Sequence, residues 1–402
     1  MTKAQKQLIA ILGNQLFGAQ NELGEFDEEQ LEAVMNEAEQ QAVFPFVYAY
    51  IEERFPENDV LRKYKRQNDM FTLKGIRNLH THNLIHQILE KNGVPYVVLK
   101  GQASAMYYSN PLMRPMGDVD LLVNIEDRER AGKLLESEGF IKKENAEKHG
   151  FHWAYYKEKE RVELHWDVPG ILYAGDVDLR SYLSDIIERR EITSMSDAAF
   201  YVPSTFHHGI VLLLHTISHI SSTGVGLRHL CDWLVFVESL TEDKFIEMFS
   251  GPLQDMGILT FAKVLTQNGV LFLGCKEKHW CSDADESVCK GILEDIFRGG
   301  NFGRKEVGRK NQVMMIRNRK TNSIAKNSAL GNILETIRQN ALRDYPICEK
   351  YPFLSPIIWT IVVVQYFIKV ALGKKYNMFN IRSLSAAKRR HSLYAKLKLF
   401  EK

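Results

Sequence analysis

Cysteine is scarce in this chain and follows no pattern. The 402 residues contain 5 cysteines, an odd number, and no C-x-x-C pair occurs. This excludes the disulfide framework of small secreted domains and predicts free thiols in a reducing compartment. Cys275, His279, Cys281 and Cys289 are spaced more widely than the ligands of structural zinc usually are, so we do not predict a zinc site there.

A long uninterrupted apolar run is also missing. The longest apolar stretch, residues 357–372, is broken by Gln365 and Lys369 and falls short of the roughly 18 apolar residues of a bilayer-spanning helix. Residues 1–18 mix amide and lysine side chains with apolar ones, and no small-residue cleavage site follows. This pattern predicts an amphipathic helix and not a signal peptide. The sequence therefore predicts a cytoplasmic protein.

Charge is distributed unevenly, although the net charge is only +2. Residues 301–402 hold 21 Lys and Arg against 5 Asp and Glu, whereas the remainder holds 31 against 45. A basic C-terminal part on an acidic body indicates an anionic partner, or docking of one part of the chain on the other. Aromatic residues at base-stacking spacing are missing from the basic part, so we do not expect nucleic acid to be the partner.

Residues 351–402 combine the apolar stretch with the basic residues Lys388, Arg389 and Arg390. The favoured interpretation is a buried core helix followed by a solvated basic tail. The alternative is an interfacial helix with a polybasic flank, which would give peripheral membrane contact through residues 355–402. This alternative keeps membrane association open beside a cytoplasmic location.

Hydrophobic periodicity predicts an α+β fold. Apolar residues recur at helical spacing up to about residue 85 and again from residue 204 onward, and short β-rich runs alternate with helices between them. With 45% hydrophobic residues, the chain is long enough for two or three domains. We predict an N-terminal helical segment 1–74, an α/β core 75–195, a helical domain 196–350, and an apolar helix with a basic tail 351–402.

The most informative motif is a pair of carboxylates on a predicted strand. Asp118 and Asp120 lie two residues apart, so their side chains leave the same face, while Val119 and Leu121 take the other face. Adjacent carboxylates repel each other and usually need a cation between them, and oxygen ligands favour Mg²⁺ or Mn²⁺. Glu163 on a second predicted strand supplies a third carboxylate, which would allow two-metal phosphoryl chemistry.

A turn before these carboxylates predicts a phosphate contact. Gly101 lets the backbone approach a phosphate closely, and the predicted helix that follows offers backbone N–H groups at its start. Lys100 adds a positive charge and Ser104 a hydroxyl. Arg114 is placed to reach the same triphosphate.

Histidines add a weaker signal. His165, on the strand of the third carboxylate, is placed to orient the acceptor or a ligand carboxylate. His208, His215 and His219 fall on one face of a predicted helix, but the glutamate of a zinc-protease helix is absent. We favour polar residues satisfied at a helix contact. The alternative is a substrate-facing wall, in which His219 and Arg228 bind an anionic acceptor.

In this order and at these spacings, the motifs resemble a known family. The runs 98–101, 118–123 and 162–166, with Arg114 between the first two, look like the uncharacterised nucleotidyltransferase family of the polymerase-β-like superfamily, over most of the chain. The resemblance implies that superfamily's α/β core, with the three carboxylates as metal ligands. The wider superfamily has Gly-Ser where this chain has Lys100-Gly101, so phosphate contact here is expected from Lys100 and backbone amides.

These observations support three hypotheses. The leading one is a metal-dependent enzyme that transfers a nucleoside monophosphate from an NTP donor to an unknown acceptor, with small molecules, glycans and proteins as the candidate classes. The second is an inactive nucleotide-binding or scaffold protein, because Gly-Ser is replaced. The third is a membrane-peripheral protein linked to surface-polysaccharide biosynthesis, because of the C-terminal helix and basic tail.

Overall fold

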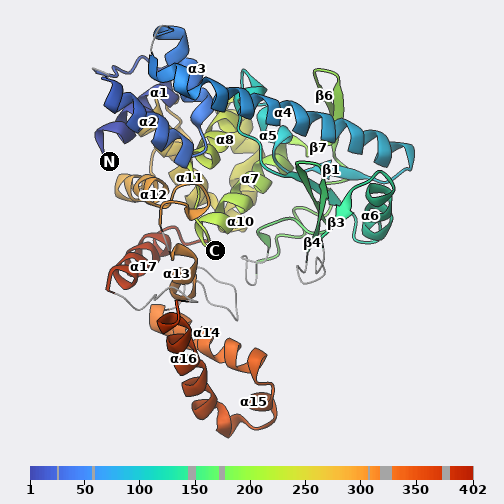
Figure 1. The fold of residues 1–402 in the computed structure, drawn as a ribbon, viewed down its shortest axis with the longest axis vertical. Helices are drawn as coiled ribbons and strands as arrows, with labels where there is room; N and C mark the ends of the chain where they lie inside the picture. Colours follow the sequence, from blue (N-terminus) through green and yellow to red (C-terminus); the bar gives the residue numbers. More distant parts are fainter. Residues whose placement is uncertain are drawn as a thin grey trace.

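In this computed structural model, the N-terminal helices form one end of the molecule (Figure 1). The long helix α4 continues from them along the sheet. The structure describes residues 1–24, 27–56, 59–143, 151–171, 177–306, 308–316, 328–373 and 381–401. Asp27 caps α2, because its side chain accepts the backbone N–H of Gln30 at 2.7 Å. The N-terminal helices are α1 (Lys3–Phe17), α2 (Glu28–Gln40), α3 (Phe44–Arg54) and α4 (Asp59–Lys91).

A mixed five-stranded sheet in the order β1-β2-β5-β4-β3 forms the α/β core. β2 and β5 run parallel, and the other neighbours pair antiparallel. A separate hairpin, β6–β7, packs on α4 and β1. The elements are β1 (Tyr96–Val98), α5 (Gln102–Ala105), η1 (Pro111–Met113), β2 (Val119–Val123), α6 (Arg128–Ser137), β3 (Ile141–Lys142), β4 (His152–Lys157), β5 (Glu160–His165), β6 (Glu191–Met195) and β7 (Ala198–Val202).

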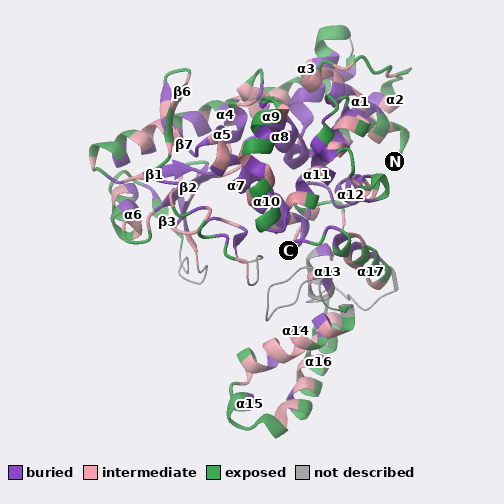
Figure 2. Cartoon of the chain, turned by 180° about the vertical axis from the view of Figure 1, so that it is seen from behind, coloured by how far each residue is buried: buried purple, intermediate pink, exposed green. Residues whose placement is uncertain are grey.

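The helices after the sheet form a second core, drawn as buried in Figure 2. α7 and α8 pack on each other, α11 packs on α8 and α12, and Trp233 of α8 is fully buried between them. The elements are α7 (Thr205–Ile220), α8 (Leu227–Glu238), α9 (Glu242–Phe245), η4 (Ile246–Ser250), α10 (Gly251–Asp255), α11 (Leu259–Asn268), η5 (Gly269–Leu273), η6 (His279–Cys281), α12 (Glu286–Gly299) and η7 (Asn301–Gly303).

The two faces of the sheet contact different cores. Val119 and Leu121 pack with residues of α4 and α6, whereas Leu122 packs with the helical core. Because side chains alternate along a strand, Asp120 faces the same side as Leu122. The carboxylate thus points toward the helices, and the two neighbouring apolar side chains face away, as their spacing predicted.

The C-terminal part contradicts the favoured interpretation of a core helix with a solvated tail. α14 and α16 form a hairpin, here called the arm, which projects from the body with α15 at its tip (Figure 1). Ile358 is the only buried residue of α16, a helix that is described throughout. α17 packs on α12 and α13, where Arg390 and Tyr394 are buried. The elements are α13 (Arg309–Ile316), α14 (Ala329–Asp344), α15 (Ile347–Lys350), η8 (Pro352–Leu354), α16 (Ser355–Ala371) and α17 (Ile381–Ala395).

The sequence-based domain boundaries fall inside structural units. The boundary at 74/75 lies within α4, a continuous helix of 33 residues that contacts both the N-terminal helices and the sheet. The boundary at 195/196 lies in the turn of the β6–β7 hairpin. Residues 351–402 do not form one part, because α16 belongs to the arm and α17 to the body. Periodicity marks a helix but does not show where it changes its packing partners.

A buried ion network fixes α13 and α17 to the body. Asp295 of α12 accepts hydrogen bonds from Arg309 Nη1 at 3.2 Å and from the Tyr394 hydroxyl at 2.6 Å, and Arg390 Nε lies 3.8 Å away. Burial would raise the pKa of Asp295, but Arg309 and Arg390 hold that pKa below its usual value. The stability that this carboxylate contributes is therefore present above its ordinary pKa and is lost as the pH falls through the lowered pKa.

Removing the charge of Asp295 should destabilise the body. Asp295→Asn leaves Arg309 and Arg390 buried without their carboxylate, and we expect the free energy of unfolding to fall by about 3–5 kcal/mol in urea titrations. Glu294→Gln, at a half-buried position on the same helix, serves as the control and should change it by less than about 0.5 kcal/mol. Equal losses in the two variants would contradict the role given to this network.

Candidate functional site

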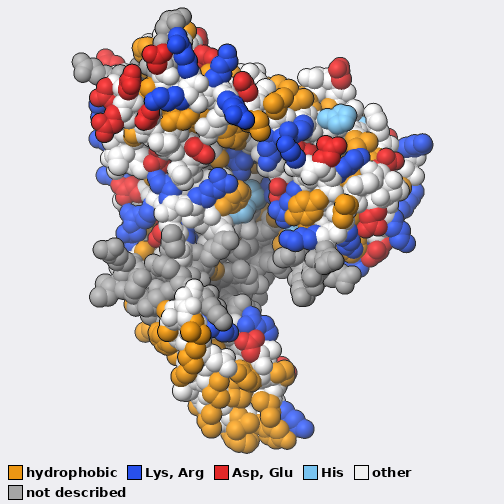
Figure 3. Space-filling view, viewed as in Figure 1, with side chains coloured by type: hydrophobic (Ala, Val, Ile, Leu, Met, Phe, Trp, Pro, Cys, Tyr) orange, Lys and Arg blue, Asp and Glu red, His pale blue; other side chains and the backbone are white. Residues whose placement is uncertain are grey.

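A cavity of about 560 Å³ lies between the sheet and the helices α7 and α8. Carboxylates at the sheet line one wall, and histidines of α7 and α8 line the other. Figure 3 shows histidine side chains in a hollow between the helical body and the sheet. Nine of the ten predicted site residues line this cavity, and the tenth, His165, lies against Asp120 and Glu163.

The three carboxylates come together at neighbouring strands. Asp118 directly precedes β2, Asp120 lies on β2, and Glu163 is the register partner of Asp120 on the parallel strand β5. The side chain of Asp118 is 36% exposed, whereas Asp120 retains 8% and Glu163 15%. The site therefore has one open carboxylate in front of two enclosed ones.

Cationic side chains compensate this negative charge. Lys100 Nζ lies 3.0 Å from Asp120 Oδ1. Arg161 of β5 bridges the other two carboxylates, with Nη1 2.8 Å from Asp118 Oδ2 and Nη2 2.5 Å from Glu163 Oε1. The sequence analysis did not identify Arg161, which lies on β5. Its role depends on the register of β5 against β2, for which the sequence gives no local signal.

His165 supports the two enclosed carboxylates. Its Nε2 lies 3.1 Å from Asp120 Oδ1 and 3.2 Å from Glu163 Oε2. Because ionised carboxylates only accept hydrogen bonds, Nε2 carries the proton and donates to both. Burial would lower the pKa of His165, but the hydrogen bonds to Asp120 and Glu163 outweigh it and raise that pKa. These are the contacts that a residue positioning metal ligands requires.

The environment keeps the enclosed carboxylates ionised. Burial would raise the pKa of Asp120, but Lys100 and His165 hold it well below its usual range. Burial would also raise the pKa of Glu163, and the hydrogen bond from His165 reverses that effect. Asp118 differs, because burial raises its pKa and the attraction of Arg161 only partly opposes the shift.

This donor set fits a hard divalent cation. Three carboxylates supply oxygen ligands of the kind that Mg²⁺ and Mn²⁺ prefer, and Asp120 and Glu163 are held in the charged form that binds metal. Lys100 and Arg161 provide the compensating charge here, and a bound cation would take over part of it.

The turn before α5 offers fewer phosphate contacts than the sequence predicted. Gly101 has φ 62°, a conformation that favours glycine, which explains its presence. However, α5 has only four residues, and the N–H groups of Ala103 and Ser104 already bond to the carbonyls of Lys100 and Gly101 at 3.2 Å. The Oγ of Ser104 is buried at the cavity and has no hydrogen-bond partner among the described residues.

Arg114 and Arg228, two of the arginines that line the cavity, have different partners. Arg114 donates from Nε and Nη2 to the carboxylate of Asp232, each at 2.7 Å, so its fork is occupied by α8. Arg114 nevertheless lines the cavity, and its contact with a triphosphate stays a prediction. Arg228 donates to the carbonyl of Pro115 at 2.9 Å, and no carboxylate pairs with it within the described part of the chain. Burial, with Arg114 nearby, lowers the pKa of Arg228 to about 10.

The predicted row of histidines divides into two groups. His208 stacks on Tyr107 with ring centroids 5.0 Å apart, away from the other two. His215 and His219 instead gather with His229 of α8, a residue that sequence reasoning missed. His229 lies beside His215 and His219 only because α8 packs on α7. No spacing in the sequence could therefore reveal the group.

The fold is α+β, with three carboxylates at neighbouring strands of a mixed sheet and helices on the other side of the cavity. This chain belongs to the uncharacterised nucleotidyltransferase family, whose model matches residues 27–268. That range holds both walls of the cavity except the loop at 301–304, and the arm lies outside it. No curated protein and no solved structure matches the chain.

Near Asp120, α4 carries a buried histidine that reports on the stability of this region. His82 is 1% exposed and packs on Phe200 with ring centroids 5.3 Å apart, and its ring nitrogens have no hydrogen-bond partner in the described ranges. Burial lowers the pKa of His82 to about 3 from 6.5. Below pH 6.5 the unfolded chain takes up a proton that the folded chain does not, so stability falls as the pH falls.

His82→Leu should flatten this pH dependence. Below the ordinary histidine pKa, the free energy of unfolding of the variant should fall by up to about 1.4 kcal/mol less per pH unit than that of the wild type. Urea unfolding of the wild type and the variant at neutral and mildly acidic pH measures the difference. His80→Leu, at an exposed position on the same helix, should keep the wild-type slope. If the slope of the His82 variant stayed unchanged, this explanation of acid sensitivity would be wrong.

Proposed function

We propose that the protein transfers a nucleoside monophosphate from an NTP to an acceptor, with a divalent metal ion held by Asp118, Asp120 and Glu163. The observation that carries the proposal is the convergence of these carboxylates at one cavity in a member of a nucleotidyltransferase family. Bound Mg²⁺ or Mn²⁺ would neutralise phosphate charge and activate the attacking oxygen.

Positive charge on the opposite side of the cavity supports binding of a triphosphate. The guanidinium of Arg228 lacks a carboxylate partner among the described residues, and its Nε is unsatisfied there. Lys74 and Arg304 line the same cavity. Phosphate oxygens satisfy such groups with strong charge-assisted hydrogen bonds. The Oγ of Ser104 adds a hydroxyl close to the Lys100-Gly101 turn.

In the proposed reaction, the acceptor hydroxyl gives up its proton and its oxygen bonds to the α-phosphorus. The bond from that phosphorus to the bridging oxygen of pyrophosphate breaks. The residues of this chain hold the reactants in line and stabilise the developing charge. A cavity of about 560 Å³ is of the size that encloses one small-molecule ligand, so a larger acceptor would enter with its reacting end only.

Asp118→Asn and Asp120→Asn should each abolish turnover. Loss of a metal ligand removes charge stabilisation worth at least about a 100-fold rate reduction. The assay is Mg²⁺-dependent pyrophosphate release from the four NTPs with a panel of hydroxyl and phosphate acceptors. Glu126→Gln, at an exposed position beyond the other end of β2, is the control and should keep wild-type activity. Turnover that survives both aspartate substitutions together would refute this site.

An inactive nucleotide-binding protein is the second candidate function. The observation that favours it is the ion pairing of Arg161 and Lys100 with all the ligand carboxylates, together with Lys100-Gly101 in place of Gly-Ser. Calorimetry separates the two candidates, because NTP binding without pyrophosphate release from any acceptor would favour the inactive protein.

We further propose that the arm contacts an anionic lipid bilayer, which would place the acceptor at a membrane. Contrary to the expectation from the sequence, the helical stretch Pro352–Ala371 is long and apolar enough to cross a membrane. Its most apolar 18-residue window has a mean hydropathy of 1.8, yet only 6% of that window is buried. Phe353 near the tip is 74% exposed and Ile357 61%. Figure 3 shows hydrophobic side chains along the arm and over its tip.

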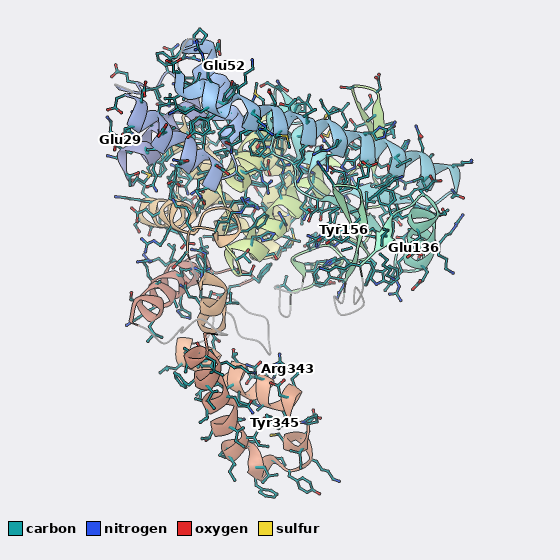
Figure 4. All side chains as sticks on the ribbon, in the orientation of Figure 1. Glu29, Glu52, Glu136, Tyr156, Arg343 and Tyr345 are labelled. Carbon is teal, nitrogen blue, oxygen red and sulfur yellow. The ribbon has the colours of Figure 1, made fainter. Side chains whose placement is uncertain are left out.

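Charge at the ends of this apolar segment favours a bilayer over a second protein. Lys350 and Lys369 are exposed at its two ends, where long cationic side chains can reach anionic headgroups. The arm also has a defined shape, because Gln365 Nε2 of α16 donates to the Tyr345 hydroxyl at 2.7 Å. Figure 4 labels Tyr345 on the arm. The structure therefore supports peripheral contact through α14–α16, and not through the whole of 355–402, because α17 packs on the body.

Vesicle co-sedimentation tests this contact. Phe353→Asp combined with Ile361→Asp should weaken binding to mixed phosphatidylglycerol and phosphatidylcholine vesicles by at least about 10-fold, because a carboxylate is costly in the apolar layer. Ile192→Asp, at a site 58% exposed on β6, is the matched control and should bind as the wild type does. The proposal would be overturned if the double variant sedimented as the wild type does. It would also be overturned if the wild type did not bind vesicles and dimerised through the arm.

A further inference from the structure

Three histidines face one another across the contact between α7 and α8. His215 and His219 are one helical turn apart on α7, with ring centroids at 4.4 Å, and the ring of His229 lies 5.4 and 5.6 Å from theirs. A ligand nitrogen from each ring lies within 4.8 Å of the other two. All three residues line the cavity opposite the carboxylates.

The enclosed member of this cluster is unsatisfied. His229 is 3% exposed, and no described residue makes a hydrogen bond of good geometry to either ring nitrogen, the backbone of Gly226 giving only a minor interaction. Leaving buried imidazole nitrogens unpaired costs free energy, and a bound ligand would offset that cost. His219 is oriented differently, because its Nδ1 lies 3.3 Å from the Thr223 hydroxyl, which leaves Nε2 for another contact. Such an outer partner is typical of metal-binding histidines.

A strained loop closes an apolar side of the cluster. Phe302 adopts φ 56°, which is unusual for a residue with a side chain, and its ring lies 4.9 Å from that of His219 and 5.9 Å from that of His229. The adjacent Gly303 admits no side chain, because a Cβ there would lie 2.2 Å from the carbonyl oxygen of Thr223. The loop thus holds an aromatic ring against the histidines at a conformational cost.

We propose that His215, His219 and His229 bind a transition-metal ion of the zinc class, separate from the carboxylate site. Three imidazoles from two helices are a ligand set that leaves a fourth position open, and that position faces the cavity. Imidazole nitrogen suits Zn²⁺, whereas the carboxylate oxygens opposite suit Mg²⁺. The two walls of one cavity therefore select different ions.

The histidines of the cluster are neutral, although cationic side chains lie near them. Burial, with Lys100 nearby, lowers the pKa of His219 to about 3, so the ring is neutral at physiological pH and its lone pair is available. Binding of an anion by histidine would draw on the protonated form instead. The cation Lys100 is already paired with Asp120 at 3.0 Å, which reduces its repulsion of a metal ion. Arg228 also lies near all three histidines, so a metal ion would bind against its charge.

The open position gives the site a role if the proposed transfer reaction takes place. A metal ion there would present its free coordination site to an oxygen of a bound substrate, on the wall of the cavity opposite the carboxylates. This part rests on the proposed function. Metal binding itself does not, so a failure of one leaves the other distinguishable.

Metal titration of the full chain tests the site. Protein stripped with a chelator should bind one equivalent of Zn²⁺ by calorimetry, and Co²⁺ should give the visible absorption of a low-coordinate nitrogen-ligated ion. His219→Gln, at a half-buried position, and His229→Gln should each weaken Zn²⁺ binding on the order of 100-fold or more, since even outer-shell partners are worth 10–100-fold. Thr223→Val should weaken it by about 10-fold as a positioning effect.

Two controls locate the ion. His208→Gln, buried on the same helix but outside the cluster, should keep Zn²⁺ affinity, and circular dichroism should confirm the fold of every variant. Asp118→Asn with Asp120→Asn should also keep it, whether or not that variant transfers nucleotides. Zn²⁺ binding that is lost in the aspartate variant but kept in His219→Gln and His229→Gln would overturn the proposal. So would a stripped protein that binds pyrophosphate through these histidines and takes up no Zn²⁺.

Discussion

The buried charge of Asp118, Asp120 and Glu163 is the constraint on which the site depends. Carboxylates this close together, two of them nearly enclosed, can stay ionised only beside cations. Lys100 comes from the turn after β1, Arg161 from the start of β5 and His165 from its end. The parallel register of β2 and β5 brings these elements together, so the sheet topology sets the electrostatics of the cavity.

The helical wall depends on a second charged contact. The bidentate pair between Arg114 and Asp232 joins the segment before β2 to α8. The Tyr108 hydroxyl donates to the same carboxylate at 2.8 Å. This contact holds α8, and with it Arg228 and His229, at a fixed distance from the carboxylates. A residue that resembled a triphosphate ligand in the sequence therefore shapes the cavity in which the triphosphate is proposed to bind.

Local patterns predicted what depends on one strand or one turn, and failed where distant segments meet. The face of the sheet on which Asp120 lies follows from the alternation of side chains along β2, and that of Glu163 follows from alternation along β5. The ion pair of Arg114 with Asp232 was not predictable, because the two residues are 118 positions apart in the sequence. For the same reason, the sequence did not reveal that Arg161 and His229 belong to the cavity. Hydropathy found the apolar helix at 355–371, but periodicity alone cannot distinguish a core helix from one on a projecting arm.

The uneven charge of the sequence also acquires a structural explanation. Several cations of the C-terminal part are used internally, since Arg309 and Arg390 surround Asp295, and Lys305 pairs with Glu37 of α2 at 2.7 Å. Docking of one part of the chain on the other therefore accounts for a share of the asymmetry. Less charge remains for an anionic partner than the totals suggest. Contact of the arm with lipid would then draw mainly on apolar area and only secondarily on charge, so added salt should weaken it little.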